Sequence, residues 1–255
     1  MIRLISTHHK TGTVFWRKVF SNIQNKHNIN FIIIEEHTKS FKDIESHLSL
    51  DKINVILDTH SALNSFEFSK NSVTSIHSFR SPAEIIFSAT NYHLKTNEKW
   101  ANIPIKKFNG LSYRQQLNNL SSLEEMLEFE MENASYNNIN RMVSKIKDSN
   151  YYHVNIDAIS TDIFMKDLIS IYRHLNINEF TKLDMTKISI GIWLDFCSRH
   201  CLWNNPKTDH TTSLKPGIPV DNRIFFSSNN KQKFKDLFGE KTYEETFKAD
   251  AFYCI

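Results

Sequence analysis

The sequence predicts an α/β protein whose central, mainly parallel sheet is flanked by helices. Strands are indicated by five short runs rich in apolar and β-branched residues: IRLIS (2–6), INFIIIE (29–35), NVILDT (54–59), VTSIHSF (73–79) and YYHVNI (151–156). Segments with apolar residues at helical spacing separate these runs, at 14–23, 83–94 and over much of 113–148. In the last segment, Ser121 is expected to cap a helix, with Glu124 closing a capping box. Because strands that alternate with helices pair in parallel, the sequence predicts helices on both faces of the sheet.

The chain after residue 156 is expected to be mostly helical, at 161–175, 185–202 and 230–238. A loop at 204–222, which holds three of the five prolines, separates the last two of these helices. No internal repeat, low-complexity tract or linker divides the chain, and 255 residues are enough to bury one full core. We therefore predict a single domain over residues 1–255.

Composition limits the classes of partner. Apolar residues make up 40% of the chain, charged residues 23%, and the net charge is +3, which gives no signature of nucleic-acid binding. No apolar run approaches the ~18 residues that a membrane span needs. Three cysteines and a start that runs directly into a strand, without a leader, lead us to expect a reducing, cytoplasmic location. Cys197 and Cys201 lie on an expected helix with no second pair to complete a zinc site, so no metal is predicted.

The segment HHKTGT (8–13) stands where the first strand turns into the first helix. At such a turn, backbone N–H groups and the helix dipole converge, which favours an anion. The segment is not a Walker A motif, because G-x-x-x-x-G-K-[ST] is absent. It is equally consistent with a plain turn in which Gly12 supplies backbone freedom and Thr13 is the N-cap.

A second segment, FRSPAEIIFSATNYH (79–93), follows another predicted strand. Arg80 stands at the end of that strand, Pro82 in the first turn of a helix, and Ser88 two turns further on. Proline favours a helix start, and an arginine at the carboxyl end of a strand suits phosphate recognition. Ligands of open α/β sheets lie at those strand ends. The second segment therefore strengthens the prediction of an anion site at the strand ends, which the first segment alone leaves open.

With these two segments the chain resembles the sulfotransferases that use 3′-phosphoadenosine 5′-phosphosulfate (PAPS). The first family motif is similar to P-K-[ST]-G-T-[TS]-[WF], which is matched here by Lys10, Thr11, Gly12, Thr13 and Phe15. His9 and Val14 depart from it. The second motif is similar to R-x-P-x-x-x-x-x-S, which Arg80, Pro82 and Ser88 match with the right spacing. The resemblance implies a P-loop-like strand-turn-helix at the N-terminus of the fold.

For the first motif, the resemblance implies a seat for the 5′-phosphosulfate of PAPS. Backbone N–H groups of residues 10–13 would bind it, and the hydroxyls of Thr11 and Thr13 would add donors. Lys10 would neutralise the charge that grows on the bridging oxygen as the S–O bond breaks. Because the protein supplies this positive charge, no metal is required.

For the second motif, the resemblance implies that Arg80 and Ser88 hold the 3′-phosphate. The later segment LKPGIPVDNRIFF (214–226) resembles the family's R-K-G-x-x-G-D-W-K. In it Lys215 falls on the arginine position and Gly217 on the first glycine, while Asp221 and Arg223 fall on the aspartate and the final lysine. Lys215 would then reach the donor from the late loop.

The general base is expected to be His60. Asp58-Thr59-His60, which follows the strand NVIL, resembles the family's K-T-H segment, with Asp58 in place of the lysine. An imidazole titrates near neutrality and suits proton removal from a hydroxyl. Glu35 and Glu36, at the end of the second strand, are the alternative bases, because carbohydrate sulfotransferases of the family often use an early glutamate.

The function implied is transfer of a sulfuryl group from PAPS, by in-line displacement, to a hydroxyl or amine of a small-molecule, lipid or saccharide acceptor. The product of the donor would be adenosine 3′,5′-bisphosphate (PAP). Two alternatives stay open from the sequence: a P-loop-like nucleotide kinase, and a non-catalytic nucleotide-binding protein of the same fold. The acceptor is not indicated by any residue pattern.

Overall fold

The computed structural model describes residues 2–24, 28–35, 41–63, 73–159, 164–175 and 221–249. These residues form two compact units. The first contains the described residues up to Arg80 together with those between Ser144 and Leu175, and the second contains Ser81–Val143 and the described residues from Asp221 onward. The single domain over residues 1–255 stays a prediction.

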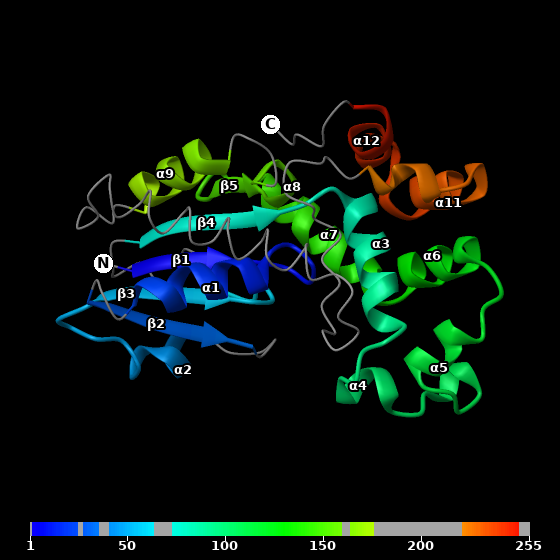
Figure 1. Ribbon diagram of the computed structural model, residues 1–255, viewed down its shortest axis with the longest axis horizontal. Coiled ribbons are helices and arrows are strands. Elements are labelled where there is room, and N and C mark those ends of the chain that lie inside the picture. Colours follow the sequence, from blue (N-terminus) through cyan, green and yellow to red (C-terminus); the bar gives the residue numbers. More distant parts are fainter. Residues whose placement is uncertain are drawn as a thin grey trace. The chain divides into compact units, whose positions relative to one another are not determined.

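The first unit is built on a parallel sheet of five strands in the order β2-β3-β1-β4-β5 (Figure 1). The strands are β1 (Ile2–Ser6), β2 (Ile29–Ile34), β3 (Ile53–Asp58), β4 (Val73–Phe79) and β5 (Tyr152–Asn155). All five predicted strands are present, and the α/β class with a parallel sheet is confirmed. The chain places β3 and β2 on one side of β1 and then crosses to β4 on the other side, so the topological switch lies at β1.

Helices of the first unit cover the sheet with apolar faces. They are α1 (Thr13–Ile23), α2 (Phe41–Glu45), α8 (Ile156–Ile159) and α9 (Phe164–His174). On α1 the fully buried side chains follow the helical spacing i, i+3, i+4, i+7, and they are Trp16, Val19, Phe20 and Ile23. This face of α1 packs against β2 and β3. Burying these side chains fixes how α1 leaves the sheet, and therefore where its first turn lies.

The second unit is helical. Its elements are α3 (Pro82–His93), α4 (Lys99–Asn102), η2 (Lys106–Phe108), α5 (Tyr113–Asn118), α6 (Leu123–Glu132), α7 (Ala134–Ile146), η3 (Asn222–Phe225), α11 (Ser228–Phe238), α12 (Glu240–Tyr243) and η4 (Glu244–Lys248). The end of α7, from Ser144, belongs to the first unit. Within the second unit, α6 packs against both α3 and α11.

Two details of the helical part bear on the predictions. The N-cap of α6 is Ser122, not Ser121: the Ser122 hydroxyl accepts from the N–H of Glu125 at 3.2 Å, and the Glu125 carboxylate accepts from Ser121. The expected cap was therefore one residue too early. In the part of the chain that the structure describes, no helix is long and apolar enough to cross a membrane. The helix expected at 185–202, with Cys197 and Cys201, lies outside the described residues.

Candidate active site at the carboxyl ends of the strands

The loop between β1 and α1 has a backbone shape that depends on left-handed residues. Lys10 has a φ of 66° and Gly12 a φ of 97°. Gly12 is the N-cap of α1 and Thr13 its first residue, with no side-chain cap, so the interpretation of Thr13 as N-cap is wrong. The first backbone N–H groups of an α-helix have no carbonyl partner within the helix, and the N-cap Gly12 has no side chain to cap them, so this helix start suits an anion.

Gly12 is also required by packing. An added Cβ would stand 2.9 Å from Cδ1 and 3.0 Å from Cγ1 of Ile156, which follows β5. Ile156 is buried, so it cannot swing into solvent. Backbone freedom and close approach thus both select glycine at this position.

Internal hydrogen bonds hold the loop closed around Lys10. The Thr11 hydroxyl accepts from the N–H of His8 at 2.7 Å and donates to the carbonyl of His8 at 3.0 Å, and the Thr11 N–H donates to that same carbonyl at 3.1 Å. From β4, the Ser78 hydroxyl donates to the carbonyl of Thr11 at 2.6 Å. The Thr11 hydroxyl, which was expected to donate to the ligand, therefore donates within the loop. Thr11 shapes the turn from a fully buried position.

The two remaining residues of the first motif, Thr13 and Phe15, lie in the first turn of α1 and differ in their surroundings. The Thr13 hydroxyl lies 2.9 Å from the hydroxyl of Thr7 and is half-buried. Phe15 is buried and meets Trp16 edge to face, with ring centroids 5.0 Å apart. Phe15 thus belongs to the packing beneath the loop, and contact with a donor stays a prediction for it.

His60 belongs to the first unit and follows β3, the strand that pairs with β1. Asp58, the last residue of β3, pairs in register with Ser6, the last residue of β1, and its carbonyl accepts from the N–H of Thr7 at 2.8 Å. The segments that follow β1 and β3 therefore begin next to each other. His60 follows two residues later and is half-buried.

Asp58 shapes the segment that carries His60. Its carboxylate accepts from the N–H of His60 at 3.2 Å and from the N–H of Leu63 at 2.7 Å. Burial raises the pKa of Asp58, while these N–H groups act in the opposite direction. Sequence reasoning noted Asp58 as a departure from the family pattern but missed this capping role.

The alternative base Glu35 has a different environment. Its side chain is exposed and pairs with Arg17 of α1. Glu35 thus has a cationic partner outside the 8–13 loop, and its role as the alternative base stays a prediction. Glu36 lies outside the described residues.

Arg80 comes directly after β4, as predicted, and its side chain is almost fully buried. Its Nε donates to Asp157 Oδ1 at 2.6 Å, and Asp157 stands on α8. A carboxylate on Nε fixes the plane of the guanidinium, which suits an arginine that recognises a planar or tetrahedral anion. No sequence pattern pointed to Asp157, because it lies 77 residues from Arg80 in the chain. Ser88 belongs to the second unit, where it is buried on α3.

The late segment is described from Asp221 onward, and Lys215 and Gly217 lie outside the described residues. Asp221 pairs with the Arg223 guanidinium at 2.7 Å, and this hydrogen-bonded pairing lowers the pKa of Asp221. Asn222 donates its N–H and its side-chain amide to the carboxylate of Glu84 on α3, at 2.8 and 2.6 Å. Asn222, in the described part of the late segment, is thereby attached to the start of α3 within the second unit.

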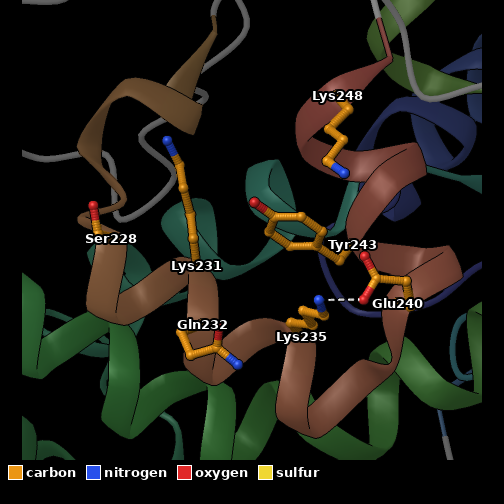
Figure 2. Close-up of a pocket in the computed structure, with 7 residues that line it drawn as sticks. All are labelled: Ser228, Lys231, Gln232, Lys235, Glu240, Tyr243 and Lys248. Carbon is orange, nitrogen blue, oxygen red and sulfur yellow. Dashed lines mark ion pairs between the residues drawn. The ribbon is translucent and has the colours of Figure 1, made fainter.

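A separate pocket of about 290 Å³ lies in the second unit. Figure 2 shows its lining, which consists of Ser228, Lys231, Gln232, Lys235, Glu240, Tyr243 and Lys248. The ammonium groups of Lys235 and Lys248 lie 5.9 and 5.7 Å from the centre of the Tyr243 ring. Both are balanced by glutamates, since Lys235 pairs with Glu240 and Lys248 with Glu244. The pocket contains none of the predicted site residues.

Comparison with solved structures identifies the fold. A mouse sulfotransferase, SULT7A1, crystallised with PAP, superimposes with a TM-score of 0.58 and 16% identity, covering 98% of this chain and 84% of that one. The chain has the sulfotransferase fold. A retinol dehydratase crystallised with androsterone and the inactive cofactor PAP also shares it, with a TM-score of 0.53 and 11% identity over 100% of this chain and 82% of the other. No family model and no curated protein sequence matches the chain.

Proposed function

We propose that the protein is a PAPS-dependent sulfotransferase. The observation that carries the proposal is the loop at residues 8–13, in which Lys10 and Gly12 have positive φ angles and Gly12 is the N-cap of α1, at the topological switch of the sheet. Such a loop suits a phosphosulfate, because its N–H groups and the helix dipole attract negative charge. The protein shares its fold with two proteins that were crystallised with PAP, and this supports PAPS as the donor.

In this reaction an acceptor hydroxyl or amine attacks the sulfur of PAPS while the bond from sulfur to the bridging oxygen breaks. The acceptor gives its proton to His60, the sulfuryl group passes to the acceptor oxygen or nitrogen, and the electron pair of the broken bond stays on the 5′-phosphate of PAP. Lys10 stabilises that developing charge, and Gly12 and Thr13 hold the phosphate through their backbone N–H groups.

Arg80 takes the 3′-phosphate of the donor, oriented by Asp157, with Ser88, Lys215 and Gly217 as further ligands of that end. Holding the donor at both phosphates fixes the sulfur for in-line attack. The acceptor is proposed to be a small molecule, a lipid or a saccharide precursor. We propose a cytoplasmic location for the reaction.

The test combines binding with turnover. Calorimetry is expected to show PAP binding more tightly than ATP with magnesium, and the reverse order would favour a nucleotide kinase. Labelled PAPS is then incubated with the protein and an acceptor pool from a cell extract, and transfer of label into new products is measured. Tight PAP binding without transfer on a broad acceptor panel would favour the non-catalytic reading.

A further inference from the structure

Three histidines form a continuous chain of imidazoles beside the anion loop. His8 follows β1, His77 lies in β4 and His153 lies in β5. The Nε2 atoms of His8 and His77 are 3.0 Å apart, the Nδ1 atoms of His77 and His153 are 3.1 Å apart, and His153 Nε2 is 3.0 Å from the carbonyl oxygen of Asp148. Adjacent rings in the chain meet edge to face, at 86° and 88°.

The far end of the chain determines where each proton lies. A carbonyl only accepts, so the Nε2 of His153 must donate to Asp148. In a neutral His153 the Nδ1 then accepts, so His77 donates from its Nδ1 and accepts at its Nε2. His8 must therefore donate from its Nε2.

The surroundings of His77 and His153 disfavour a positive charge on these two imidazoles. His8 and His77 are buried, and burial together with the other two imidazoles and Lys145 lowers the pKa of His77 to about 2. Burial also lowers the pKa of His153, against the opposing effect of Asp148. A cation among these groups would be desolvated beside a lysine, which is unfavourable.

The near end of the chain reaches the loop. The backbone carbonyl of His8, on the same residue as the first imidazole, accepts from both the N–H and the hydroxyl of Thr11, and Lys10 with its positive φ lies between His8 and Thr11 in the chain. A lysine with positive φ stays there only where its surroundings impose that shape. The family motif that the loop resembles has a rigid proline at position 9, where this chain has histidine.

We propose that His77 is a positioning residue for the anion loop, and that the neutral chain from His153 through His77 to His8 supplies the rigidity that the missing proline would give. The inference rests on the proposed function in one respect only: it takes the phosphate of the donor as the ligand that the ordered loop binds. The chain has a distinct signature: His77 carries its proton on Nδ1, whereas His8 and His153 carry theirs on Nε2.

The experiment uses the full chain and three readouts. Nitrogen-15 spectra of the histidine rings give the tautomer of each. Amide hydrogen exchange at Thr11 reports on loop order without any ligand, and it is expected to accelerate at least tenfold in His77→Phe. Calorimetry with PAP is expected to show affinity about tenfold weaker in His77→Phe, as for loss of one buried hydrogen bond. His77→Gln, whose amide can still accept from His8, is expected to recover part of both effects.

His174→Phe is the matched control, because His174 is exposed and stacks on Tyr152 outside the chain of three histidines. In this variant, amide exchange at Thr11 and the affinity for PAP should match those of the wild type. A wild-type His77 that is charged, or that carries its proton on Nε2, would overturn the proposal. So would unchanged exchange at Thr11 in a folded His77→Phe variant. If the wild type does not bind PAP, the proposed function falls, and the tautomers and the exchange rates still decide the role of His77.

Discussion

Replacing Gly12 with alanine tests the central feature of the loop. A φ of 97° is unfavourable for any residue with a Cβ by about 1–2 kcal/mol. The new Cβ would also stand 2.9 Å from Ile156 Cδ1, and such overpacking costs about 1–3 kcal/mol. We therefore expect Gly12→Ala to lower the free energy of unfolding by about 2–5 kcal/mol, measured by urea denaturation followed by far-UV circular dichroism.

Two comparisons separate the backbone cost from the packing cost. Gly110 has a φ of 86° and nothing within 4 Å of an added Cβ, so Gly110→Ala should show only the backbone cost of about 1–2 kcal/mol. Ile156→Val removes the Cδ1 atom that meets the new Cβ. In the double variant we expect part of the Gly12→Ala loss, about 1 kcal/mol, to be recovered relative to the sum of the single changes. If the two changes are additive and Gly12→Ala costs no more than Gly110→Ala, the close-approach argument is wrong.

The remaining predictions concern charge. Lys10→Ala should remove about 3–4 kcal/mol of transition-state stabilisation, seen as slower turnover of labelled PAPS, with only a modest loss of PAP affinity. Near-normal turnover would refute the role of Lys10. Arg80→Ala should weaken PAP binding in calorimetry by about 2–3 kcal/mol, and unchanged affinity would remove Arg80 from the donor site. His60→Ala should abolish turnover at every pH while PAP still binds; an active His60→Ala paired with an inactive Glu35→Gln would transfer the role of base to Glu35. Burial lowers the pKa of His77 to about 2 in the folded protein, against 6.5 in the unfolded chain. As the pH falls below 6.5, only the unfolded chain takes up a proton at this residue. His77 should therefore lower the free energy of unfolding by about 2 kcal/mol from pH 7 to pH 5. Denaturation of His77→Phe at both pH values should lack that increment, and an equal pH dependence in both proteins would contradict it.

The sheet could be predicted because its signal is local. Each strand is a short apolar run, and a buried parallel strand needs little more than that in sequence. All five predicted runs coincide with strands to within a residue or two. The cap of α6 could not be placed to the residue, because Ser121 and Ser122 are both good caps and the choice depends on which serine reaches the N–H of Glu125.

The site was predictable only where its residues are neighbours in the chain. Lys10 and Gly12 were identified from the loop sequence, and the structure gives both the left-handed backbone such a loop needs. The partners that hold the site come from distant strands: Ser78 reaches the loop across 67 residues, and Asp157 reaches Arg80 across 77. A sequence without pairing information contains no signal for such contacts, since a serine or an aspartate at those positions fits many environments.

The departure at Asp58 has a local explanation that the sequence did not reveal. By residue matching, Asp58 occupies the position of a family lysine, which suggested altered electrostatics next to His60. In the fold its carboxylate accepts from the N–H groups of His60 and Leu63, at the place where β3 ends beside β1. A lysine has no acceptor and could not cap this turn. The exchange therefore replaces a positive charge beside the site with a buried anchor that orients the segment bearing His60. Under the proposed function, the positive charge beside the phosphosulfate is then expected from Lys10, on the segment that follows the neighbouring strand β1.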